Sequence, residues 1–84
     1  MKILIVDDQP SNRMIVKYFL ESEGHSCIEA EDGQEAIDKF MQQNPDVVLM
    51  DIVMPIMDGY QSAFYIKKYA TDSHVPIIFL IPLV

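Results

Sequence analysis

The sequence is poor in cysteine and in basic residues, and both shortages limit what the protein can do. Cys27 is the one cysteine in the chain, so no intrachain disulfide can form, and we expect a small buried residue of a reduced, cytoplasmic protein. A redox role is disfavoured because no second thiol could resolve an oxidised Cys27. The chain has 6 basic and 13 acidic residues and a formal net charge of -7. This charge repels nucleic acids and anionic membrane surfaces, so we expect neither as a direct partner.

Long apolar stretches are missing as well. The longest run, Val75–Val84, contains two prolines and is about half as long as a membrane-spanning helix. We expect no signal peptide, because Met1 and Lys2 lead directly into a strand-like segment. There are no internal repeats, linkers or low-complexity tracts. The 84 residues, half of them apolar, therefore predict one small domain over residues 1–84, near the lower size limit for a core that stabilises itself.

Four short apolar runs are present, and stretches with helical spacing separate them. This alternation of strand and helix is typical of a parallel sheet covered on both faces. The second run has a more alternating pattern than the others, so we expect it at an edge of the sheet. The predicted strands are Ile3–Val6, Ser26–Ala30, Asp46–Met50 and Val75–Ile81.

The three intervening stretches carry helix signals. The first has Pro10 near its start and Gly24 just past its end. The second starts at Asp32, three residues before Glu35, in the arrangement of a capping box, and ends at Asn44-Pro45. The third begins near Gly59 and runs to about Ala70. Apolar residues three to four apart define one side of the first helix and the buried side of the second: Met14, Ile15, Tyr18, Phe19; Ala36, Ile37, Phe40, Met41.

Acidic residues follow two of the predicted strands. Asp7 and Asp8 close the first strand and Asp51 closes the third. The flavodoxin-like strand order 2-1-3-4 is one of the two common orders for such a chain, and it makes the first and third strands neighbours. The three carboxylates would then meet at the carboxyl ends of adjacent strands, where open α/β sheets bind ligands.

Three crowded carboxylates repel one another unless they are protonated or bridged by a cation. Mg²⁺ is the best candidate, because it prefers oxygen ligands and can also recruit phosphate oxygens. Asp51 could then act as a nucleophile on phosphorus while the cation offsets the transferring charge. The alternative is structural: an aspartate at a strand end often caps a helix or makes a turn, and Asp8 near Pro10 could do only that.

Several segments of the sequence form a recognisable set: Ile3–Asp8, Asn12, Arg13, Asp32–Ala36, Val47–Asp51 and Met54–Gly59. They resemble the signature segments of bacterial two-component response-regulator receiver domains, and the likeness runs from residue 1 to about residue 80. By this resemblance Asp51 is the phosphorylated residue, Asp7 and Asp8 hold Mg²⁺, and the backbone carbonyl of Val53 is a further ligand. The resemblance also implies a signalling domain rather than an enzyme, with a histidine kinase or phosphotransfer protein as its partner.

The sequence departs from the family pattern near its end. Receivers carry Ser or Thr at the end of the fourth strand, where Ile81 stands here, and a lysine on a fifth strand that has no counterpart. Lys67 and Lys68 lie too far along the third helix to replace that lysine. We therefore expect a truncated receiver of four strands and three helices, which lacks the fifth strand and the last two helices.

An uncovered fourth strand would expose backbone groups that seek another chain. We therefore expect a homodimer, formed by pairing of the fourth strands or by exchange of Pro76–Val84. An alternative function follows: a dimerisation or interaction module that keeps the fold without switching. A phosphatase-like hydrolase is disfavoured, because those enzymes resemble one another in having a second Asp where Val53 stands.

Overall fold

The structure, a computed structural model, describes residues 1–51, 64, 67–68 and 75–80. All four predicted strands are present, with some ends shifted by one or two residues, and the first two predicted helices are confirmed. The elements are β1 (Lys2–Val6), α1 (Pro10–Ser22), β2 (Ser26–Ala30), α2 (Gly33–Gln43), β3 (Val47–Asp51) and β4 (Ile77–Leu80).

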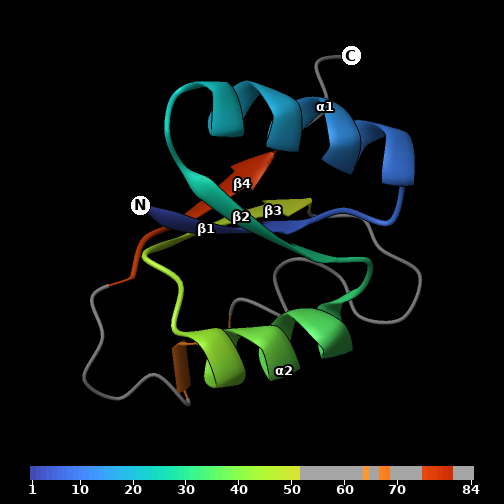
Figure 1. Cartoon of the computed structure of the whole chain (residues 1–84). Helices are drawn as coiled ribbons and strands as arrows, with labels where there is room; N and C mark the ends of the chain where they lie inside the picture. Colours follow the sequence, from blue (N-terminus) through green and yellow to red (C-terminus); the bar gives the residue numbers. More distant parts are fainter. Residues whose placement is uncertain (52–63, 65–66, 69–74, 81–84) are drawn as a thin grey trace.

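The four strands form one parallel sheet in the order β2-β1-β3-β4. Helix α1 covers one face of this sheet and α2 covers the other (Figure 1). This arrangement confirms the flavodoxin-like prediction and places β2 at an edge, as its alternating sequence indicated. The order also makes β1 and β3 direct neighbours, which positions the acidic residues that follow β1 and end β3.

The core has two layers, because alternate residues of each strand point to opposite faces. On the α2 side the buried residues include Leu4, Val6, Val48 and Met50, which pack with Phe40 of α2. The layer on the α1 side is smaller and consists of Ile3, Ile5 and Val47, with Cys27, Leu49, Val16 and Leu20 partly buried against it.

Helix α1 does not bury the apolar side that the sequence suggested. Four of its large apolar side chains are between 66% and 78% exposed: Met14, Ile15, Tyr18 and Phe19. Val16 and Leu20 contact the sheet instead, and Arg13 and Lys17 lie on the same side. The reason lies on β2, where Glu29 faces α1 and binds both cations. This acidic strand residue favours the helix face that carries basic residues.

Helix α2 follows the prediction more closely. The side chain of Asp32 accepts a hydrogen bond of 2.8 Å from the backbone N–H of Glu35, and so caps the helix. Ala36, Ile37 and Phe40 are buried, whereas Met41 is 57% exposed and does not belong to the core. The helix ends at Asn44, whose positive φ of 49° turns the chain toward β3.

Two further predictions are changed or only partly covered. Cys27 is partly buried rather than buried, because it lies on the edge strand β2; burial still raises the pKa of its thiol. Of the third predicted helix, the structure describes Phe64, Lys67 and Lys68, which are helical and exposed; the rest of that helix lies outside the described residues. Within the described residues no helix is long and apolar enough to cross a membrane.

Candidate metal centre

The candidate site lies at the carboxyl ends of β1 and β3. Val6 of β1 pairs in register with Met50 of β3, so the next residues, Asp7 and Asp51, lie side by side at the end of the sheet. The backbone N–H of Asp7 donates to the carbonyl of Ala30 at 3.1 Å, which ties the first residue after β1 to the edge strand. The backbone hydrogen bonds of the sheet therefore fix the positions from which the Asp7 and Asp51 side chains extend.

The three predicted carboxylates do meet. Asp7, Asp8 and Asp51 each offer an oxygen, and these oxygens all lie within 4.8 Å of one another. Asp7 is buried, Asp51 is partly buried and Asp8 is exposed, so the cluster has a solvent-exposed side from which an ion can approach. The predicted convergence is confirmed by this geometry.

Asp7 is the most constrained member of the cluster. Burial raises the pKa of its carboxyl group, and the negative charges of Asp51 and Asp8 raise it further, whereas the hydrogen bond from Gln9 lowers it. That hydrogen bond joins the Gln9 N–H to Asp7 Oδ1 at 2.9 Å. Burial is therefore the main cause of the raised pKa, and the crowding of negative charge, which a bound cation would relieve, adds to it.

The structural alternative for Asp8 is not what the structure shows. The N-cap of α1 is Gln9, and no side chain caps that helix end. The turn is made by Asp7 instead, whose side chain accepts from the N–H two residues later. Asp8 therefore has no capping role at α1 and is available to the cluster.

The donor set fits Mg²⁺. The cluster supplies only carboxylate oxygens, which a hard divalent cation prefers, and an exposed side where the ion could keep several waters. Two predicted residues cannot be placed, because Val53 and Ile81 lie outside the described residues. Glu31, Asp32 and Glu35 form another acidic group, but the Asp32 side chain caps α2, which gives this group a structural role.

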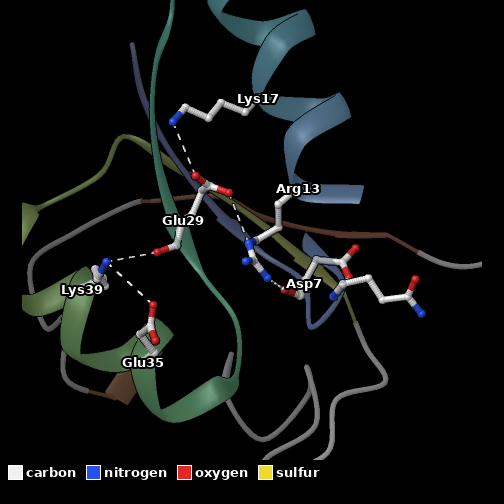
Figure 2. A network of polar contacts seen from close by, with 7 residues as sticks. Asp7, Arg13, Lys17, Glu29, Glu35 and Lys39 are labelled. Carbon is white, nitrogen blue, oxygen red and sulfur yellow. Dashed lines mark hydrogen bonds and ion pairs between the residues drawn. The ribbon is translucent and has the colours of Figure 1, made fainter. Parts of the chain in front are cut away.

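The sequence placed Arg13 in the family pattern but gave it no role at the site, and the structure shows that Arg13 reaches the site from α1 (Figure 2). Its Nη1 donates to the backbone carbonyl of Asp7 at 2.6 Å, and its Nε pairs with Glu29 Oε1 at 3.2 Å. Lys17 Nζ lies 3.4 Å from the other oxygen of Glu29. Arg13 and Lys17 are four residues apart on one helix face, and this spacing was the available signal. Their acceptor on β2 could not be identified from local sequence.

The family model described as "Response regulator receiver domain" matches residues 3–81. The chain belongs to this family. Among curated proteins it is 48% identical over 82 residues to a protein named "Probable transcriptional regulator ycf27" from Guillardia theta, which covers 98% of this chain and 31% of that protein. The chain is therefore a receiver domain of the kind found in two-component response regulators.

Solved structures agree with this assignment. The response regulator protein TrrA from Thermotoga maritima, in complex with Mg²⁺-BeF, has a TM-score of 0.84 and 38% identity and covers 93% of this receiver and 68% of that chain. A structure of the histidine kinase ThkA in complex with TrrA has a TM-score of 0.88 and 40% identity and covers 99% of this receiver and 70% of that chain. The matched region spans 30% to 64% of the length of the curated relatives.

Proposed function

We propose that this receiver accepts a phosphoryl group on Asp51, with Mg²⁺ bound by the carboxylates of Asp7, Asp8 and Asp51 and by the backbone carbonyl of Val53. The observation that carries the proposal is the convergence of the three carboxylate oxygens within 4.8 Å at the ends of β1 and β3. The pKa of Asp7 supports it in part: burial raises that pKa most, and the negative charges of Asp51 and Asp8 raise it further. TrrA, with its Mg²⁺-BeF complex, is a relative of similar fold.

Asp51 is the nucleophile in this proposal. One of its carboxylate oxygens attacks the phosphorus of a phosphohistidine, and the new O–P bond forms as the P–N bond breaks. The electron pair of the broken bond stays on the imidazole nitrogen, which takes up a proton from solvent, and Asp51 becomes an acyl phosphate. Mg²⁺, when bound, supplies positive charge for the transferring oxygens. Asp7, which accepts a hydrogen bond from Gln9, and Asp8, on the exposed side of the cluster, would hold the ion next to Asp51.

A histidine kinase or phosphotransfer protein is the proposed phosphoryl donor. ThkA in complex with TrrA is one kinase with a receiver that resembles this chain. In this scheme the protein is a signalling domain and not an enzyme, because the phosphoryl group ends on its own side chain. Weak self-phosphorylation from a small donor and slow hydrolysis of the acyl phosphate are the activities that we expect of the chain alone.

The test uses a small phosphoryl donor and mass spectrometry. Incubation with acetyl phosphate and Mg²⁺ should add the mass of one phosphoryl group to the parent chain. Asp51→Asn should remove that addition, whereas Asp38→Asn, a change at an exposed acid of α2, should keep it. Beryllofluoride with Mg²⁺ should perturb the NMR signals around the cluster in the parent but not in Asp51→Asn. A parent chain that shows neither response contradicts the proposal.

A second candidate function is a dimerisation module that keeps the fold without switching. The observation that favours it is Ile78, which is 51% exposed on β4, the strand expected to pair with a second copy or to exchange as part of Pro76–Val84. The two functions use different surfaces, since dimer formation would use β4 and phosphorylation would use the carboxyl ends of β1 and β3. A parent chain that dimerises but takes up no phosphoryl group would favour the non-switching module.

A further inference from the structure

Arg13 stands in an unfavourable place for a basic residue. It lies in the first turn of α1, which begins at Pro10, and the amino end of a helix carries partial positive charge that repels cations. Its side chain is also only 13% exposed, so the guanidinium group has lost most of its hydration. A basic residue in such an unfavourable position is expected to make an interaction nearby that offsets the cost.

The guanidinium group has two acceptors, and one of them belongs to the candidate metal centre. Nη1 donates to the backbone carbonyl of Asp7 at 2.6 Å, and Nε donates to Glu29 at 3.2 Å. The planar guanidinium holds its N–H groups in a fixed fork, so the Glu29 carboxylate on β2 sets the direction in which Nη1 points (Figure 2). Glu29 therefore anchors the Arg13 side chain, and Arg13 in turn holds the backbone carbonyl of Asp7.

The held carbonyl lies between two proposed Mg²⁺ ligands. It belongs to the peptide unit that joins Asp7 to Asp8, and a peptide unit is planar and rigid. Fixing its oxygen therefore fixes the rotation of that unit and the direction in which the chain continues to Asp8. Asp7 also bonds two backbone groups: its N–H donates to the Ala30 carbonyl, and its side chain accepts from the Gln9 N–H. The bond from Arg13 is the one among these that a side-chain substitution elsewhere can remove.

We propose that Arg13 is a positioning residue for Mg²⁺: anchored by Glu29, it fixes the Asp7–Asp8 peptide so that both carboxylates can reach one cation. The inference rests on the proposed function, since it takes the carboxylate cluster as the site of Mg²⁺. In this scheme Arg13 binds the Glu29 carboxylate and the Asp7 carbonyl, and it acts on the carboxylates of the cluster only through the backbone. Its effect is to organise the ligands before the cation binds.

Lys17 provides a matched control. It lies one turn after Arg13 on the same face of α1 and binds the same Glu29 carboxylate at 3.4 Å, but the structure gives it no bond to Asp7. Arg13→Met and Lys17→Met each remove one cation from Glu29 and leave an unbranched apolar side chain. Only the first also releases the Asp7 carbonyl.

The measurement is a titration of the whole 84-residue chain with MgCl₂, without phosphoryl donor, followed by NMR at the backbone amides of Asp8 and Gln9. Arg13→Met should raise the Mg²⁺ dissociation constant about tenfold, at the lower end of the effect of losing a partner that orients a metal ligand. Lys17→Met should leave it within about twofold, because it does not touch Asp7. Arg13→Lys should restore part of the affinity, since one ammonium can reach the Asp7 carbonyl without the fork to Glu29.

Several outcomes overturn the inference. It fails if folded Arg13→Met binds Mg²⁺ like the parent, or if Lys17→Met weakens binding as much as Arg13→Met does, which would show a general effect of Glu29 pairing on the fold. If circular dichroism shows that Arg13→Met is unfolded, Arg13→Lys takes its place, and parental affinity in Arg13→Lys contradicts the role of the fork.

The parent chain and Asp51→Asn separate this inference from the proposed function. If the parent binds Mg²⁺ and is phosphorylated while Arg13→Met is unchanged, the positioning role alone fails. If the parent shows no Mg²⁺ response, or if Asp51→Asn binds Mg²⁺ as the parent does, the proposed metal centre fails and the role of Arg13 fails with it.

Discussion

Asp7 combines three demands on a single side chain. It makes the turn that leads into α1, it is 7% exposed, and it shares its surroundings with two other carboxylates. The turn needs only a hydrogen-bond acceptor at Oδ1, which an amide could supply equally well. The negative charge of the carboxylate is needed only to bind a cation. Asp7 is therefore a residue at which stability and the proposed function favour different side chains.

Replacing Asp7 by asparagine should stabilise the metal-free protein at neutral pH. The folded-state pKa of Asp7 is raised above its unfolded value, so the folded state binds this proton more tightly and loses stability as pH rises through the folded pKa. The asparagine side chain keeps an acceptor for the Gln9 N–H and carries no charge. In EDTA, Asp7→Asn should melt a few degrees above the parent at neutral pH, and the difference should shrink at acid pH, where the parent's Asp7 is protonated.

Asp38→Asn is the control for this comparison, because Asp38 is an exposed acid on α2 away from the cluster. It should change the melting temperature little at either pH. If the parent melts at a higher temperature than Asp7→Asn at neutral pH in EDTA, the ionised Asp7 carboxylate does not destabilise the metal-free protein, and the prediction is wrong. Adding Mg²⁺ should reverse the order, since the ion stabilises only the chain that binds it.

At the scale of the elements, the two helices show which sequence signals decide a structure. Helix α2 carries a cap, one apolar stripe and a left-handed end, and all of these signals lie within its own sequence. The strands were likewise predictable from their apolar runs. Helix α1 carries two competing apolar sides, and the choice between them depends on Glu29, a residue on another element. The sequence alone could not show that contact.

The candidate site, too, was predictable from the sequence only in part. The meeting of Asp7, Asp8 and Asp51 was predictable, because strand order and strand ends follow from patterns that repeat along the chain. The hold of Arg13 on the Asp7 carbonyl was not, because it depends on the angle at which α1 crosses the sheet and on the rotamer of a long side chain. The position of the Val53 carbonyl stays a prediction.

The cap of α2 can be tested directly. Asp32→Ala removes the acceptor of the Glu35 N–H and should lower the free energy of unfolding by about 1 kcal/mol. For a domain of this size the melting temperature should fall by about 4–8 °C. Asp38→Ala removes an exposed acid from the same helix and should have a much smaller effect. Equal losses in both variants, measured by thermal circular dichroism, would show that net charge and not the cap sets the change.

At the scale of the whole molecule, charge and apolar surface act in opposite directions. The net charge of -7 makes two copies repel, and salt screens this repulsion. The exposed apolar side chains favour association. Four of them lie on α1, namely Met14, Ile15, Tyr18 and Phe19, and Ile78 lies on β4. A homodimer through β4 should therefore be weak at low salt and stronger at high salt.

Ile78 allows this proposal to be tested on one side chain. Sedimentation velocity at micromolar concentration should show dimer for the parent, with a larger dimer fraction as salt is added. Ile78→Lys places a charge on β4 where the second copy would pack, and should leave a folded monomer at all salt concentrations. Met41→Lys is the matched control, because Met41 is similarly exposed, at 57%, but lies on α2. It should dimerise like the parent once salt has screened the added charge. A parent chain that sediments as a monomer throughout contradicts pairing through β4, whereas loss of dimer in Met41→Lys as well would indicate an interface that includes α2.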